Sequence, residues 1–187
     1  MAVIINATTT TGLTTSADNS GVIQFQSNGA NTVGISSTGY LTIGGNQQIY
    51  GPAFSAYRST GQNITSATWT KVQLNNENYD TNNCFDSSTN YRFTPNVAGY
   101  YMITASIGDY GSTTASFCQS RIDKNGAVYV YGNEQSGTTG VSTVSVTLYM
   151  NGTTDYLELY GYISASTAII GSDGTTVRMT GSMIRGA

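Results

Sequence analysis

Short runs of alternating hydrophobic and polar residues, separated by clusters of Asn, Gly, Ser and Thr, recur along the whole chain. Alternation with a period of two is typical of β-strands that bury one face. The turn-forming clusters return about every eight to twelve residues, as in sandwiches and barrels, and no stretch shows the period of an amphipathic helix. The pattern therefore predicts an all-β protein with its principal strands at 53–58, 69–74, 91–94, 99–107, 117–124, 127–131, 141–150, 156–163 and 176–184.

Residues 20–51 form three short strand-and-turn units whose apolar positions fall on one face. Full burial would stabilise each of these side chains by about 1.5 to 3 kcal/mol, whereas ordering each residue of the segment costs about 1.5 kcal/mol. The segment is therefore not expected to fold alone. Three copies around a common axis would bury all three faces, which predicts a triangular β-prism stalk in a homotrimer, with these stalk positions: Ile23, Phe25, Val33, Ile35, Leu41 and Ile43.

The remaining organisation follows from composition. Residues 1–19 are Thr-rich, which predicts an extended segment, and carry one apolar patch at Val3, Ile4 and Ile5. This arm is either a frayed terminus or an anchoring strand that docks on another protein. Pro52 marks the start of a head domain, 52–187, because proline cannot donate to a sheet ladder and keeps its predecessor extended.

One stretch, residues 91–106, resembles the centre of the globular head of the complement first component and of the tumour necrosis factor superfamily, which reads F-T-x-P-x-x-G-x-Y-x-F/I. Three further segments resemble that family in the same order: the opening strand 53–58, the Asn-Gly turn at 124–126 and the closing strand 179–184. The resemblance spans essentially the whole head and implies a ten-stranded jelly-roll sandwich that forms tight homotrimers. The matching residues of the central motif are Phe93, Thr94, Pro95, Gly99, Tyr101 and Ile103.

Alternation and the family motif together indicate which side chains point inward. Tyr101 and Ile103 share one face of the predicted strand 99–107, and Tyr100 lies on the other. The expected head core is Phe54, Phe93, Tyr101, Ile103, Leu148 and Leu157.

The stalk also carries a resemblance of its own. Over about twenty-five residues it is similar to the trimeric stalk repeats of bacteriophage tail fibres, S-G-x-L-x-L-x-T-x-G followed by V-x-x-x-G-x-V-x-I-G. The positions that match are Ser20, Gly21, Ile23, Phe25, Val33, Ile35, Gly39, Leu41, Ile43 and Gly44.

Composition excludes several classes of function. The net charge is -3, and the seven Lys and Arg residues form no cluster, so we expect no nucleic-acid partner. No apolar run approaches the roughly 18 to 20 residues of a membrane span, so we expect no membrane insertion. We expect the protein to be synthesised in the cytoplasm of its host cell. Cys84 and Cys118 are expected to be free thiols, with a disulfide as the alternative.

The chain has no histidine and only ten Asp and Glu residues, so we expect neither an enzyme nor a cofactor. The nearest carboxylate pairs are Asp80 with Asp86 and Asp155 with Glu158, and both have simpler interpretations. Asp80 and Asp86 are expected to cap turns, and Glu158 is expected on a solvated strand face. A calcium site that includes Asp80, Asp86 or Asp109 is conceivable. Its spacing matches no known loop pattern, and the favoured expectation is no metal.

Two features could serve recognition. The tyrosines alternate along strands, where core and subunit packing is the favoured interpretation, although tyrosines also suit binding surfaces. The loops at 79–90, 107–115, 133–140 and 164–174 are rich in residues that hydrogen-bond carbohydrate, but any jelly roll also turns its corners with such loops.

A complement-like head on a phage-like stalk resembles a bacteriophage virion surface protein. The first hypothesis is a homotrimeric short fibre or spike whose head binds a glycan or protein on the host surface. The alternative is a capsid decoration or cement trimer that contacts other virion proteins through its N-terminal arm. A bacterial surface adhesin is a second alternative, disfavoured because the sequence shows no export signal.

Overall fold

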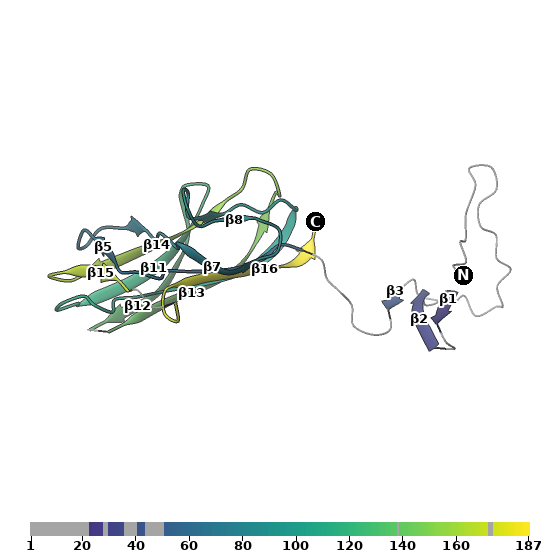
Figure 1. The fold of residues 1–187 in the computed structure, drawn as a ribbon, viewed down its shortest axis with the longest axis horizontal. Coiled ribbons are helices and arrows are strands. Elements are labelled where there is room, and N and C mark those ends of the chain that lie inside the picture. Colours follow the sequence, from purple (N-terminus) through teal and green to yellow (C-terminus); the bar gives the residue numbers. More distant parts are fainter. Residues whose placement is uncertain (1–22, 28–29, 36–40, 44–50, 138, 172–173) are drawn as a thin grey trace. The chain divides into compact units, whose positions relative to one another are not determined.

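The computed structural model describes residues 23–27, 30–35, 41–43, 51–137, 139–171 and 174–187. The chain separates into two compact units, Met1–Ile49 and Tyr50–Ala187. Every regular element among the described residues is a β-strand (Figure 1). Within these ranges, no helix is long and apolar enough to cross a membrane.

The first unit contains a three-stranded antiparallel sheet in the order β1 (Ile23–Ser27), β2 (Ala30–Ile35) and β3 (Leu41–Ile43). The register places the six predicted stalk positions in two rows across the sheet. One row is Ile23, Ile35 and Leu41, and the other is Phe25, Val33 and Ile43. The β-prism stays a prediction, and the predicted arm with Val3, Ile4 and Ile5 lies outside the described residues.

The second unit, the head, is a sandwich of two sheets. The first has the order β13-β10-β16-β4-β7, and the second has the order β12-β11-β14-β9-β8 with β6 paired to β14. Apart from the pairs β11–β12 and β8–β9, neighbouring strands are distant in sequence, as in a jelly roll. The first sheet contains β13 (Val141–Met150), β10 (Gly99–Gly108), β16 (Arg178–Gly186), β4 (Ala53–Tyr57) and β7 (Asn76–Asp80). The second contains β12 (Ala127–Ser136), β11 (Phe117–Lys124), β14 (Leu157–Ser164), β9 (Arg92–Phe93), β8 (Phe85–Asp86) and β6 (Thr70–Lys71). A small separate sheet pairs β5 (Gln62–Ile64) with β15 (Ala168–Ile170).

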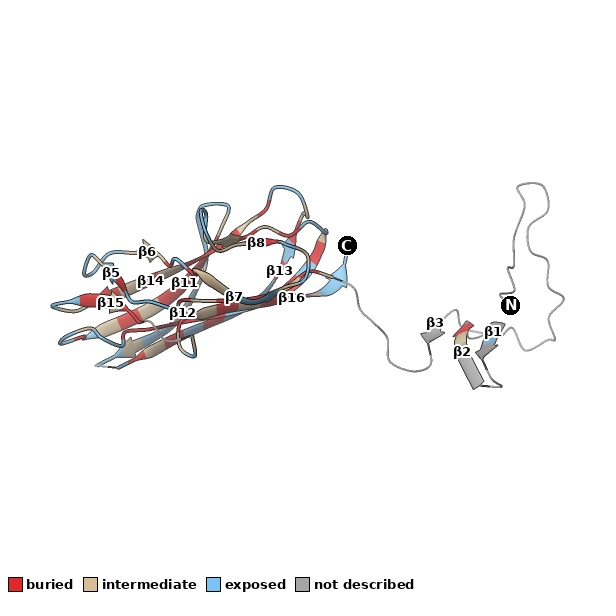
Figure 2. Cartoon of the chain, viewed as in Figure 1, coloured by how far each residue is buried: buried red, intermediate tan, exposed pale blue. Residues whose placement is uncertain are grey.

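The hydrophobic core lies between the two sheets of the head, and Figure 2 shows buried residues alternating with exposed ones along the long strands. All six residues expected in the core are buried, and five of them are fully inaccessible. Phe54 stacks on Phe93 with ring centroids 4.3 Å apart, and the Tyr101 hydroxyl donates a hydrogen bond to the Val97 carbonyl at 2.7 Å. This aromatic cluster joins the sheets across the sandwich.

The predicted Asn-Gly turn connects β11 to β12. Asn125 and Gly126 both have positive φ, 55° and 77°, the combination that a tight hairpin turn requires. The Asn125 side chain also accepts a hydrogen bond from the Tyr156 amide at 2.9 Å. This links the hairpin to the start of β14.

Several strands differ from the alternation pattern. The predicted strand 69–74 is reduced to β6, because Val72 and Leu74 turn into the core. The strand predicted at 127–131 continues to Ser136 as β12. Alternation did not indicate β5, β7, β8 or β15; β7, for example, reads Asn-Glu-Asn-Tyr-Asp and lies at a sheet edge.

The first and last residues of the head lie at the same end of the sandwich. The Met183 amide donates to the Pro52 carbonyl at 3.0 Å, and Gly99 pairs with Gly186. The opposite end carries β5, β15 and the connections β10–β11, β12–β13 and β14–β15 (Figure 1). We call this opposite end the distal end of the head.

Candidate functional site

The outer face of the six-stranded sheet carries a dense set of aromatic and charged side chains. Cys118, Ser120 and Ile122 of β11 are buried on the inner side, and Phe117, Gln119, Arg121 and Asp123 alternate with them on the outer side. The register sets Arg121 between Tyr131 of β12 and Tyr160 of β14, Gln119 opposite Tyr162, and Phe117 opposite Ser164.

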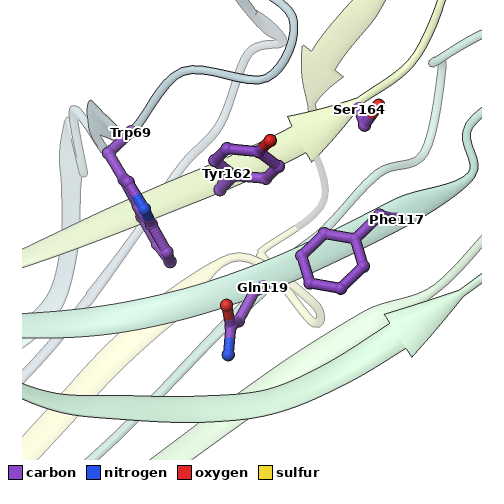
Figure 3. Close-up of a pocket in the computed structure, with 5 residues that line it drawn as sticks. All are labelled: Trp69, Phe117, Gln119, Tyr162 and Ser164. Carbon is purple, nitrogen blue, oxygen red and sulfur yellow. The ribbon is translucent and has the colours of Figure 1, made fainter.

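Part of this outer face forms a groove toward the distal end of the sheet, which we call the aromatic groove. Trp69, Phe117, Gln119, Tyr162 and Ser164 line it, and its volume is about 380 Å³. Figure 3 shows Trp69 and Phe117 on opposite sides of the groove, with Tyr162 of β14 and Gln119 of β11 between them. The rings meet at steep angles: Trp69 and Tyr162 are 5.4 Å apart at 51°, and Phe117 and Tyr162 are 5.7 Å apart at 87°. The groove therefore offers both ring faces and ring edges.

A buried ion pair lies beneath the aromatic side chains. The Arg121 guanidinium donates to both Asp123 oxygens, from Nε at 2.6 Å and from Nη2 at 2.8 Å. The guanidinium also lies 4.5 Å from the Trp69 ring centroid and 4.9 Å from that of Tyr160. Arg121 is only 9% exposed because the rings cover it.

Glu158 belongs to the same row of outer-face charges, and its expected solvated position is wrong. It is only 7% exposed and accepts a hydrogen bond from Lys71 Nζ at 3.0 Å. The cause is β6, which adds to the edge of β14 and brings Lys71 opposite Tyr160. Alternation within β14 alone contains no information about that neighbour.

The outer face of the five-stranded sheet is different in character. Its exposed large side chains are Tyr79, Tyr100, Met102, Tyr149 and Ile184, which we call the Tyr100 face. Tyr100 and Tyr149 contact edge to face at 5.6 Å. A shallow hollow of about 150 Å³ beside Met102 is lined otherwise by Tyr79, Thr104, Thr180, Gly181 and Ser182, all uncharged.

Asp80 and Asp86, two of the three metal candidates, cap turns. Asp80 accepts hydrogen bonds from the amides of Asn82 and Phe85. Asp86 accepts them from the amides of Ser88, Thr89 and Asn90. The bonds from Thr89 and Ser88 lower the pKa of Asp86 well below its usual range. Both carboxylates therefore hold the loop between β7 and β9 in shape.

Asp109, the third candidate, lies apart from the other two at the distal end of β10. It is 1% exposed, and neither carboxylate oxygen has a hydrogen-bond partner among the described residues. Burial raises its pKa. In the described part of the chain, no three His, Cys, Asp or Glu side chains come together as a metal site would require.

The two cysteines are free and buried, as expected. Burial raises the pKa of the Cys118 thiol to about 12, with Asp109 as the second cause, and it also raises that of Cys84. Neither thiol is therefore activated as a nucleophile.

The aromatic groove was not predicted from the sequence. The loops were the expected recognition elements, and packing was the favoured interpretation of the strand tyrosines. Three of the four loop segments, 107–115, 133–140 and 164–174, belong to distal connections, while 79–90 connects strands at the other end. Alternation along the predicted strand 117–124 could have indicated it. Phe117, Gln119 and Arg121 lie on the face opposite to Cys118 and Ile122, and therefore on the outside of the sheet.

Comparison with solved structures shows that the head has the jelly-roll fold of complement and tumour necrosis factor heads. The globular domain of zebrafish complement 1qA matches with a TM-score of 0.54 and 16% identity, over 74% of this chain and 100% of that one. Eiger TNF from S. frugiperda matches with a TM-score of 0.53 and 10% identity, over 74% and 96%. The PRD1 vertex protein P5 matches with a TM-score of 0.52 and 17% identity, over 71% and 96%. No protein-family model and no curated protein matches the chain by sequence.

Proposed function

We propose that the chain is a homotrimeric surface protein of a bacteriophage virion and that its head binds a receptor on the host surface. The observation that carries this proposal is a jelly-roll head, similar in fold to the vertex protein P5 of phage PRD1, preceded by a segment that resembles phage fibre stalks. The complement and TNF neighbours support a head of the kind that self-associates and binds.

The Tyr100 face is the proposed trimer contact of the head. Tyr100 is 44% exposed and Met102 is 50% exposed, and the hollow beside Met102 has an uncharged lining. Aromatic and methionine side chains without charges are typical of the centre of a protein interface. A cluster of exposed apolar side chains on one sheet is also typical of a protein–protein interaction site. A second and a third copy of the same chain would cover it.

The two apolar rows of β1–β3 support the same assembly. Residues directly opposite each other in a sheet share a face, and so do residues two apart in one strand; the backbone register of β1–β3 therefore supports the proposal that the six stalk positions form one apolar face. Three such sheets around one axis would bury that side. Stalk and head would then trimerise together.

The proposed receptor-binding region is the distal end of the head. Its loops are tolerant of sequence change, and a trimer would present each of them three times, which raises avidity without new contacts. The aromatic groove lies toward the same end, on the sheet opposite the Tyr100 face.

The test is binding of the full-length protein to susceptible and resistant host cells, with inhibition of infection as the second readout. We expect binding to susceptible cells only, and fewer plaques when the protein is added before phage. If the protein binds neither cell type and leaves infection unchanged, the receptor-binding proposal is wrong.

A capsid decoration trimer is the second candidate, favoured specifically by the likeness to a vertex protein. In this alternative the arm, residues 1–19, would clamp neighbouring capsid subunits through Val3, Ile4 and Ile5. Electron cryomicroscopy of particles, combined with capture of capsid protein by the arm, separates the candidates. Density on the capsid together with absence of cell binding would favour decoration.

A further inference from the structure

The aromatic groove has the dimensions of a small-ligand site and is too small for a protein partner. Its volume of about 380 Å³ falls at the lower end of the roughly 300 to 1,000 Å³ that small-molecule sites occupy. A stable protein interface covers about 800 Å² on each partner, which far exceeds five lining residues. The occupant that fits is therefore a molecule, or a projecting part of one, of about the size of a mono- or disaccharide.

The five residues that line the groove carry no charge. The cation beneath it, Arg121, is held by Asp123 through two hydrogen bonds. Lys71, on the neighbouring strand, is held by Glu158 and by the Asn90 carbonyl, each at 3.0 Å. A phosphate or carboxylate would need a cation or a set of aligned amides to replace its water. Since both cations are already paired, the groove favours an uncharged ligand.

The residues that line the groove also carry hydrogen-bonding groups. Four polar atoms of lining residues have no hydrogen-bond partner within the described ranges: Trp69 Nε1, Gln119 Oε1, Tyr162 Oη and Ser164 Oγ. The other end of the Gln119 amide is fixed, because Nε2 donates to the Gly132 carbonyl at 3.1 Å. The groove therefore offers donors and acceptors next to apolar ring faces. A neutral sugar ring matches this combination, with C–H groups on its faces and hydroxyls around its edge.

We propose that the aromatic groove binds a neutral glycan, with one sugar ring against Trp69 and Tyr162 and its hydroxyls hydrogen-bonded to Gln119 and Ser164. This rests on the proposed receptor-binding function and names the chemical class of the receptor. The groove is preformed, because Trp69 is held between the Arg121 guanidinium and the rings of Tyr131 and Tyr162. A rigid platform loses little entropy when a sugar binds.

The test uses the full-length protein on an array of immobilised neutral oligosaccharides built from glucose, galactose, N-acetylglucosamine or rhamnose. Sialylated and phosphorylated glycans and a proline-rich peptide serve as comparisons. Trp69 is the single tryptophan of the chain, so its fluorescence reports binding in solution. We expect at least one neutral glycan to bind and to shift the Trp69 emission in a saturable way.

Two variants test the groove, and a third is the matched control. Tyr162→Ala removes a wall and Gln119→Leu removes a polar contact at nearly constant size, so each should weaken binding about tenfold or more. Tyr129→Ala removes an exposed ring of β12 that does not line the groove and should leave affinity unchanged. Thermal unfolding shows which variants are folded, and Gln119→Leu carries the test if Tyr162→Ala is not.

Several outcomes would overturn the inference: binding only to charged glycans, binding only to the proline-rich peptide, no glycan binding at all, or equal affinity in Gln119→Leu and wild type. Cell binding separates this inference from the proposed function. If wild type and Gln119→Leu bind susceptible cells equally, the glycan groove is wrong while receptor binding stands. If wild type binds a neutral glycan but no host cell, the proposed function fails instead.

Discussion

The guanidinium of Arg121 lies 4.5 Å from the centre of the Trp69 ring while it holds Asp123 by two hydrogen bonds. One side chain thus supports the wall of the groove and neutralises a buried carboxylate. The aromatic groove depends on this pair for both its shape and its neutrality.

Replacing Arg121 with Ala should lower the free energy of unfolding by about 3 to 5 kcal/mol, because it leaves the Asp123 carboxylate buried without a partner. Urea unfolding measures the loss. The double variant Arg121→Met, Asp123→Leu is the control, since replacing both ions with apolar groups of similar size is often neutral or stabilising. A single variant as stable as wild type would mean that the pair is exposed in solution.

Tyr101 at the centre of the core should be highly sensitive. Tyr101→Ala removes a fully buried ring whose centroid lies 5.5 Å from that of Phe93. It should lower the free energy of unfolding by about 3 to 5 kcal/mol. Tyr101→Phe keeps the ring and loses only the hydrogen bond to Val97, which is worth about 1 kcal/mol. Denaturant unfolding measures the loss in free energy of unfolding of each variant. Equal losses in the two variants would contradict a packing role for the ring.

Met102→Asp should convert the protein to monomers or prevent assembly of its heads. In the proposed trimer this substitution desolvates three carboxylates without partners, whereas the fold of each head keeps its core. Val128→Asp is the matched control, because Val128 is equally exposed but lies on the other sheet. Sedimentation at micromolar concentration reads out the mass. A stable wild-type mass of 19.7 kDa would refute the trimer itself.

Asp109 and Asp86 should give the stability opposite dependences on pH. The folded-state pKa of Asp109 is raised by burial, so its favourable contribution is complete below the unfolded pKa of about 4 and declines as pH rises through the folded value. Asp109→Asn should therefore be more stable than wild type at pH 7, with the difference vanishing near pH 4. Thermal unfolding across this range provides the measurement.

The pKa of Asp86 is lowered by the amides of Thr89 and Ser88, so the sign is reversed. Its contribution is present above the unfolded pKa of about 4 and declines as pH falls toward the folded value. Asp86→Ala should be less stable than wild type at pH 7, and the gap should narrow on acidification. Parallel pH profiles for the Asp109 and Asp86 variants would contradict both assignments.

Residues 51–187 should fold without the preceding segment, since every residue of the hydrophobic core cluster lies after Gly51. Circular dichroism and a cooperative urea transition of this fragment provide the measurement. A fragment with no cooperative transition would place the head boundary before residue 51.

The sequence was most informative where alternation and turn chemistry agree. β10, β11 and β13 match the predicted strands within one residue, because each alternates cleanly and ends at Gly or Asn-rich turns. β7 was not predicted, since its polar residues pair at a sheet edge where little burial is required. Strand phase assigned Tyr101 inward and Tyr100 outward, as observed.

The groove was harder to predict, because its walls come from distant segments. Trp69 precedes β6, which reaches its position only by pairing with β14, far away in the sequence, as in Tyr160 with Lys71 and Gly161 with Thr70. No local pattern encodes that pairing. The burial of Glu158 has the same origin, because its partner Lys71 arrives with the same short strand.

The position of the first and last residues of the head at one end has a practical consequence. The pairing of Gly99 with Gly186 and the hydrogen bond from Met183 to Pro52 place both ends of the folded head away from the distal connections. A peptide inserted between β12 and β13 would project from the far end of the sandwich, so the head is suited to serve as a display scaffold.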